Sequence, residues 1–233
     1  MEIIAEIGQN HNGDMTLAKE LIIAAKESGA DVAKFQIFNA EETFGTENNP
    51  WIDYNKKTEL SRDDVNLLHE ECQSHRIEFM SSIFHSRYID WLEHLNVKRY
   101  KVASRSIHNK NLINSLLLVK KPLIISLGFW KEENFPNFGL KNKIDYLYCI
   151  SKYPTDLGDL NLNIVNFKEY SGFSDHSIGT SAAIYALSNG AKIIEKHFTL
   201  DKNMYGPDHN LSANPEELTS IVKFRDDLKK INR

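Results

Sequence analysis

The chain has 233 residues, of which 28 are Lys or Arg and 32 are Asp or Glu, so its formal net charge at pH 7 is −4. This balance, together with the lack of a long basic run, argues against a nucleic-acid-binding surface. No apolar stretch reaches the roughly 18 residues that a membrane span requires, and no signal peptide is recognisable, so we expect a cytoplasmic protein. Cys72 and Cys149 lie in apolar patterns, as reduced and packed thiols do.

Short runs rich in Ile, Val, Phe and Tyr recur along the chain, a pattern typical of buried strands. Eight such runs lie at residues 2–6, 31–38, 77–81, 99–103, 122–126, 145–149, 170–174 and 192–196. Eight is the number of parallel strands that closes a barrel when each strand is followed by a helix.

Helical patterns separate most of these strands. In the first, apolar residues from Leu17 to Ala25 share one face, with Asp14 as the N-cap and Gly29 just past the end. Further helices are predicted after the cap Ser61, at 86–95, at 109–119, at 178–188, and from Asn214 and Pro215 to Lys229, Lys230 and Arg233. The alternation predicts an α/β fold, a single (β/α)8 TIM barrel domain over residues 1–233, with an open doubly wound sheet as the alternative.

Two segments do not fit a helical crossover. Residues 39–57, with Gly45 and Pro50, have the composition of a long loop. Residues 129–142, with Pro136 and Gly139, indicate a missing or degenerate helix after the fifth strand. Both segments are therefore expected departures from an ideal barrel.

Reactive side chains gather where the predicted strands end, and in a (β/α)8 barrel the active site forms at the C-terminal mouth. These residues are Glu6, Lys34, Gln36, Ser82, Lys101, Ser104, Ser126, Ser151, Tyr153, Ser174, Asp175, His176, Glu195 and His197. We therefore expect them to surround one site.

His176 and His197 each close an apolar run, so neighbouring strands, about 4.8 Å apart, could present two imidazoles to one metal ion. An acidic residue stands beside each histidine and could orient it. The alternative is that both are core or capping histidines bonded to backbone. Asp208, in the turn from Gly206 to His209, is either a third metal neighbour or a turn former.

Lys34 and Lys101 lie within apolar strands, where a charge is costly unless it meets an anion. With the hydroxyls of the strand-end serines they describe a pocket for phosphate or carboxylate. Two alternatives stand beside this prediction: a buried ion pair with Glu6 or Glu195, and a Schiff-base lysine as in aldolase barrels.

Several motifs resemble the N-acetylneuraminate (sialic acid) synthase family, and the resemblance covers nearly the whole chain. They are Ile3 to Asp14, Lys34 to Gln36, Tyr100 to Ser104, Phe173 to His176, Glu195 to Leu200 and Gly206 to His209. The resemblance implies a metal-dependent transferase in carbohydrate biosynthesis. Its reaction would join phosphoenolpyruvate to an N-acetyl hexosamine in its open aldehyde form, giving a nine-carbon 2-keto acid of the sialic, legionaminic or pseudaminic type.

The resemblance also implies a role for each site residue. His176 and His197 would bind a divalent metal, which is usually Mn²⁺ in that family and which polarises the sugar aldehyde. The phosphoenolpyruvate cradle would be Lys34, Ser82, Lys101, Ser104, Ser126 and Ser174. Glu6 matches a catalytic glutamate, and Ser151, Tyr153 and Asp208 match positions on the sugar side.

The sequence also departs from the family. Family members carry a glutamate two positions after the serine that matches Ser104, where this chain has Ser106. They usually continue into an antifreeze-like domain that supplies an arginine to the partner subunit's sugar site. We expect this domain to be lacking, so a homodimer or a separate antifreeze-like domain protein is the expected protein partner.

We further predict that Arg105, next to the cradle, supplies part of the positive charge that the antifreeze-like domain would bring. The competing interpretation of the whole chain is a non-catalytic or partner-dependent barrel that binds phosphoenolpyruvate or sugar. Tight binding without turnover would distinguish it from an enzyme.

Overall fold

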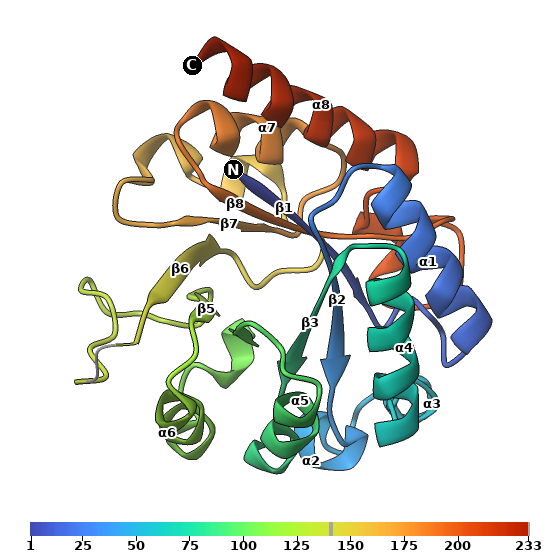
Figure 1. Cartoon of the computed structure of the whole chain (residues 1–233). Helices are drawn as coiled ribbons and strands as arrows, with labels where there is room; N and C mark the ends of the chain where they lie inside the picture. The colour runs from blue at the N-terminus through green and yellow to red at the C-terminus, as the bar shows by residue number, and fades with distance from the viewer. Residues whose placement is uncertain (140–141, 233) are drawn as a thin grey trace.

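The computed structural model describes residues 1–139 and 142–232, and these form a closed barrel of eight parallel strands (Figure 1). The strands are β1 (Glu2–Gly8), β2 (Val32–Ile37), β3 (Glu78–Ile83), β4 (Tyr100–Val102), β5 (Leu123–Ser126), β6 (Ile144–Cys149), β7 (Gly172–Asp175) and β8 (Ile193–His197). All eight predicted strands and the barrel are confirmed, and β8 pairs with β1 to close it. Arg233, predicted near the last helix end, lies outside the described residues.

The interior of the barrel has an apolar lower part and a polar upper part. A buried cluster of aliphatic side chains and one methionine fills the lower part: Ile4, Val32, Met80, Ile124, Leu147 and Ile193. Because side chains alternate along a strand, the inward position after Ile4 is Glu6 and that after Val32 is Lys34. The apolar plug therefore supports a polar layer directly beneath the mouth.

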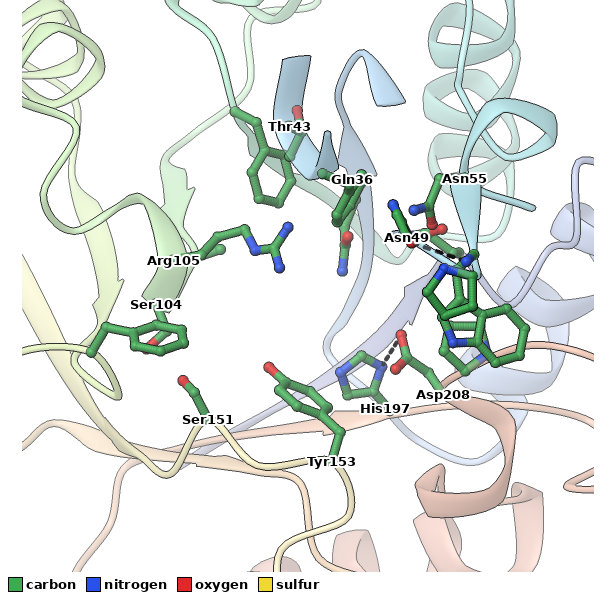
Figure 2. Close-up of a pocket in the computed structure, with 18 of the residues that line it drawn as sticks. Gln36, Thr43, Asn49, Asn55, Ser104, Arg105, Ser151, Tyr153, His197 and Asp208 are labelled. Carbon is green, nitrogen blue, oxygen red and sulfur yellow. Dashed lines mark hydrogen bonds and ion pairs between the residues drawn. The ribbon is translucent and has the colours of Figure 1, made fainter. Parts of the chain in front are cut away.

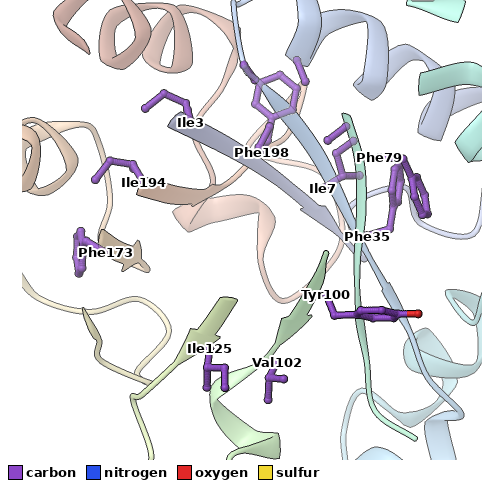
Figure 3. Packing of buried hydrophobic residues seen from close by; sticks show 14 of the residues in the cluster. Ile3, Ile7, Phe35, Phe79, Tyr100, Val102, Ile125, Phe173, Ile194 and Phe198 are labelled. Atoms are coloured by element: carbon purple, nitrogen blue, oxygen red, sulfur yellow. The ribbon is translucent and has the colours of Figure 1, made fainter. Parts of the chain in front are cut away.

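The outward-facing strand residues pack against the helices in the larger core. This cluster includes Ile3, Phe35, Tyr100, Phe173 and Ile194, which point away from the barrel axis (Figure 3). The helices are α1 (Met15–Glu27), α2 (Ala40–Phe44), α3 (Ile52–Lys57), α4 (Arg62–Ser74), α5 (Ile89–His94), α6 (Lys110–Val119), α7 (Ser181–Ser188) and α8 (Pro215–Ile231).

The predicted caps are confirmed. Asp14 accepts hydrogen bonds from the first backbone N–H groups of α1, and Ser61 and Asn214 form capping boxes at α4 and α8. The helix predicted from 178 begins later, at Ser181, because Gly179 adopts a left-handed turn with φ of 81°. The helix predicted from 86 opens with a 3-10 turn before α5.

The long loop predicted at 39–57 is wrong in part, because this segment contains α2 and α3. Asn39 caps α2 by accepting a hydrogen bond from the backbone N–H of Glu42. Gly45 ends the helix with a φ of 71°. Capping at both ends thus stabilises a helix of only 5 residues that hydrophobic periodicity could not reveal.

Two consecutive crossovers have no α-helix in the part of the chain described. The degenerate crossover after β5 is confirmed for residues 129–139 and 142, while 140 and 141 of that prediction lie outside the described residues. The segment between β6 and β7 carries only the 3-10 helices Leu157–Asp159 and Leu162–Ile164, which the sequence did not predict. As a result, the outward side chains of β6 are only half-buried.

Across the described residues, no helix is both long and apolar enough to cross a membrane.

Candidate active site at the barrel mouth

A pocket of about 780 Å³ opens at the C-terminal mouth of the barrel (Figure 2). It is lined by the C-terminal ends of strands and by the segments that follow them, including Gln36, Asn49, Trp51, Asn55, Ser104, Arg105, Ser151, Tyr153, His197 and Asp208. Arg105, Ser104 and Ser151 lie on one wall, whereas Asn49, Asn55 and Asp208 lie on the opposite wall. The predicted site residues Glu6, Lys34, Lys101 and Ser174 are buried beneath this pocket.

Lys34 is held by two carboxylates in the buried polar layer. Its ammonium lies 2.7 Å from Glu6 Oε2 and 3.3 Å from Glu195 Oε2, and it donates to Ser82 Oγ over 3.2 Å. Burial opposes the charge of Lys34, but Glu195 and Glu6 outweigh it and raise the pKa of the ammonium. The buried ion pair that the sequence left as an alternative is therefore present.

Lys101 completes the layer from the other side. It donates to Ser126 Oγ over 2.8 Å and lies 3.5 Å from Glu195 Oε1, which also accepts from Ser174 Oγ over 2.8 Å. Burial lowers the pKa of Lys101. Burial alone would raise the pKa of Glu195, but the charges of Lys101 and Lys34 outweigh it and lower that pKa to about 2. Glu195 is thus the carboxylate shared by both lysines.

Burial raises the pKa of Glu6, the second carboxylate of the layer. Glu6 Oε1 accepts a short hydrogen bond of 2.6 Å from Gln36 Nε2. Glu6 Oε2 and Glu195 Oε2 are buried without an aligned hydrogen bond from the described residues. Both oxygens contact the Lys34 ammonium as ion pairs, so these two carboxylates are held in the layer by charge.

His176 and His197 lie together at the junction of the pocket and the buried layer. Their ring centroids are 5.5 Å apart, and the ring of Tyr153 covers His176 with a centroid separation of 4.1 Å. Two imidazoles that bind one ion at about 2 Å would have centroids about 5 Å apart. The observed spacing therefore fits two ligands of one ion.

The partners of the two histidines differ from those expected, because neither adjacent acidic residue orients its neighbour. His176 Nδ1 lies 2.8 Å from the carbonyl oxygen of Ile150, which leaves Nε2 available as a ligand. His197 Nδ1 lies 3.7 Å from Asp208 Oδ2 and has no hydrogen bond from the described residues. Burial lowers the pKa of His197 to about 4, so it is a neutral imidazole at pH 7.

The third metal neighbour is not established by the geometry. Within residues 1–139 and 142–232, no three His, Cys, Asp or Glu side chains are grouped closely enough to hold an ion together. Asp208 lines the pocket beside His197 and also precedes the 3-10 helix His209–Leu211 as its N-cap. The metal prediction thus rests on the two histidines.

Arg105 lies at the pocket wall, as predicted, and its guanidinium sits 4.6 Å from the centre of the Phe44 ring. Burial lowers the pKa of Arg105 somewhat, and the groups opposing that shift are Tyr153 and Asp208. Ser106, which takes the position of the family's glutamate, is buried and does not line the pocket. Of these two neighbouring residues, Arg105 therefore faces the cavity and Ser106 does not.

Gly128, just after β5, leaves room where two site hydroxyls converge. A Cβ at this position would lie 2.4 Å from Ser151 Oγ and 2.6 Å from Ser104 Oγ. Cys149, which the sequence indicated as a packing residue, is buried beside the same hydroxyls and lies 3.8 Å from His176 Nδ1. It is a free thiol that also forms part of the floor of the site.

Sequence reasoning missed the side chains that α2, α3 and their connection bring to the pocket. Asn49 and Trp51 line it from the connection, and Asn55 lines it from α3 with a side chain that is almost fully buried. Buried amides that face a cavity are a signal of ligand binding. The signal was hidden because the segment was interpreted as a loop.

Comparison with known proteins gives one consistent result. The NeuB family model matches residues 21–232. The N,N'-diacetyllegionaminic acid synthase of Legionella pneumophila is 40% identical over 95% of this chain and 70% of its own length. The pseudaminic acid synthase of Campylobacter jejuni is 33% identical over 94% of this chain and 71% of its own length.

A solved structure supports the same grouping. The crystal structure of N-acetylneuraminic acid (sialic acid) synthetase from Leptospira borgpetersenii, in complex with citrate, superposes with a TM-score of 0.89 at 33% identity. The match covers 98% of this chain and 84% of that one. The barrel and the order of its elements are thus shared with this synthetase.

Proposed function

Because the chain belongs to the NeuB family, we propose that it condenses phosphoenolpyruvate with the open aldehyde form of an N-acetylated hexose. A bond forms between C3 of phosphoenolpyruvate and the aldehyde carbon, water adds at C2, and phosphate leaves. The product is a nine-carbon 2-keto sugar acid of the sialic, legionaminic or pseudaminic type. The single observation that carries the proposal is the pair of buried lysines directly beneath a wide polar pocket.

The buried layer has the chemistry to receive phosphoenolpyruvate. Lys34 and Lys101 supply two ammonium groups, and the hydroxyls of Ser82, Ser126 and Ser174 each already donate to or accept from a member of the layer. An incoming phosphate or carboxylate would replace Glu6 or Glu195 as the partner of a lysine. The charge that develops on phosphate departure would then be stabilised by groups already in position.

A divalent ion, Mn²⁺ in our proposal, would be held by His176 and His197 and, when bound, would polarise the aldehyde oxygen. The spacing of the two rings and the unpartnered, buried Nδ1 of His197 support the fit. An ion that keeps several waters, or completes its shell with substrate oxygens, requires few protein ligands. The two histidines also separate the cradle from the pocket above it.

The opposite wall suits the sugar. Gln36, Asn49, Asn55 and Asp208 present amide and carboxylate groups that can pair with hydroxyls and with an N-acetyl group. The ring of Tyr153 packs against His176, and its hydroxyl points toward the wall formed by Ser151 and Arg105 (Figure 2). We propose that the sugar aldehyde is held between the opposite wall and the histidine pair.

The direct test is phosphate release from phosphoenolpyruvate by the purified chain with Mn²⁺ and a panel of N-acetyl hexosamines, including diacetylated ones. We expect release that depends on both the metal and one sugar of the panel, with one 2-keto acid formed per phosphate. If no sugar supports release, the synthase proposal fails.

One observation favours a second candidate, a non-catalytic barrel that binds phosphoenolpyruvate or sugar: Ser106 replaces an acidic residue and is buried away from the pocket. Binding of either ligand without turnover across the panel would support this candidate. A cytoplasmic location, which the two free cysteines support, is part of our proposal. A homodimer or a separate antifreeze-like domain protein stays a prediction.

A further inference from the structure

An ion pair on the outer side of the barrel joins the two strands that carry the histidines. Asp175 ends β7 and Lys196 precedes His197 in β8, and both side chains are completely buried. Lys196 Nζ lies 3.0 Å from Asp175 Oδ2. Because side chains alternate, this pair lies on the opposite face of the sheet from His176 and His197 and cannot contact the substrate.

Lys196 also reaches beyond the end of the backbone ladder. The last register pair of β7 and β8 is Asp175 with Lys196, one residue before each histidine. Lys196 Nζ donates a hydrogen bond to the carbonyl oxygen of Ser177 as well as to Asp175. Lys196, which precedes His197, therefore binds both sequence neighbours of His176.

Asp175 fixes the same turn from the other side. Its Oδ1 accepts hydrogen bonds from the backbone N–H and the hydroxyl of Ser177, over 2.8 and 2.7 Å. The carbonyl oxygen of His176 accepts from Thr155 and its ring contacts Ile150, so the backbone around His176 is held at every side. His197 is held by its own carbonyl, which accepts from Ala213.

We infer that Lys196 is a positioning residue that sets the separation of His176 and His197. The inference rests on the proposed function, because it gives the pair its role as ligands of one divalent ion. Beyond the ladder, Lys196 supplies two hydrogen bonds from β8 to the residues on either side of His176. The ring of Tyr153 also contacts both imidazoles, but it lies in the loop after β6 and does not tie the two strand ends together. Without Lys196 the ring separation of 5.5 Å would therefore be less firmly fixed.

The test measures Mn²⁺ binding directly, by the electron paramagnetic resonance signal of free Mn²⁺, without turnover. Lys196→Met removes the ammonium, and the double variant Asp175→Asn with Lys196→Met avoids leaving a buried carboxylate unpaired. We expect both variants to bind Mn²⁺ on the order of tenfold to a hundredfold more weakly, as losses of partners behind metal ligands do. The dissociation constant for phosphoenolpyruvate, measured without metal, should change by less than about twofold because the cradle lies on the inner face.

Arg225→Met is the matched control, because Arg225 is a buried cation paired with Asp31, and its hydrogen bonds and ion pairs within the described residues do not involve either histidine. It should lower the melting temperature without weakening Mn²⁺ binding. Equal Mn²⁺ affinity in wild type and both Lys196 variants would overturn the inference alone. A wild-type chain that binds no Mn²⁺ would overturn the inference together with the metal part of the proposed function, whereas Mn²⁺ binding without phosphate release would sink only the synthase reaction.

Discussion

The two ends of the barrel use paired charges in different ways: the groups are half-buried at the N-terminal end and buried at the mouth. At the N-terminal end, Arg99 binds Glu2 and Glu78 and thereby joins β1 and β3. At the mouth, Lys34 and Lys101 share Glu6 and Glu195. A guanidinium forms several hydrogen bonds in a fixed plane, whereas an ammonium is a point charge that changes partners readily. From this comparison we expect charge at the base to serve stability and charge at the mouth to be available to a ligand.

The largest expected effect comes from removing one cation from each end and comparing the two variants. Lys101→Met should lower kcat/KM for phosphoenolpyruvate by about 10² to 10³-fold, since it removes a positioned donor from the reacting phosphate. Arg99→Met should leave kcat/KM unchanged and lower the melting temperature. Steady-state kinetics and thermal unfolding of both variants provide the measurement. A comparable loss of activity in both would mean that the two ends are not functionally distinct.

The second prediction concerns the pH dependence of stability, which should include a contribution from a buried histidine at the mouth of the barrel. His11, in the loop after β1, is completely buried, and burial lowers its pKa from the ordinary 6.5 to about 4. Between these values the unfolded chain binds a proton that the folded chain does not, so stability falls as the pH falls through this window. The loss reaches about 3 kcal/mol for one group.

His11→Asn should flatten this part of the pH profile, because Asn can still accept from the backbone N–H of Gly13 as His11 Nδ1 does. Urea unfolding at a series of pH values gives the slope. Arg99→Met should leave the fall in stability caused by His11 in place, since Arg99 itself does not titrate in this window. An unchanged slope in His11→Asn would show that the acid sensitivity comes from another group.

The smallest expected effect concerns Arg105 at the pocket wall. Arg105→Ala should raise the KM for the sugar about tenfold, on the order of one charge-assisted hydrogen bond, with little change in the KM for phosphoenolpyruvate. Arg62→Ala is a suitable control because Arg62 is exposed at the start of α4. Unchanged sugar kinetics would show that Arg105 does not bind the sugar. A rise in the KM for phosphoenolpyruvate would show that it acts on that substrate instead.

Much of the fold follows from the sequence because buried parallel strands leave a strong local pattern. Eight apolar runs with helical segments between most of them predicted the closed barrel, and strand ends meeting at one mouth predicted which residues gather there. The crossover after β6 was missed because its 3-10 turns carry no periodicity over several turns. The helices α2 and α3 were missed for the same reason.

The site was predicted less completely than the fold, since contacts across the barrel depend on side-chain direction. Lys34 was predicted to bind a ligand anion, with a buried ion pair and a Schiff-base lysine as alternatives, and the structure shows the ion pair. His176 pairs with the backbone carbonyl of Ile150, and a contact to the backbone cannot be predicted from residue types because every residue has a carbonyl. Asn49 and Asn55 reach the pocket from a segment without strand character, so strand-end reasoning could not find them.

The half-buried strand β6 has a consequence for how the site responds to its ligands. Amide hydrogens exchange with solvent through local openings, and these cost least where few apolar contacts cover the backbone. No α-helix covers β6 on either side in the described residues, and Ser151 and Tyr153 follow directly from its end. We therefore expect local openings to cost least around β6, next to the ligands that contact those two side chains. Slower amide exchange in β6 on addition of a ligand would indicate that it has bound there.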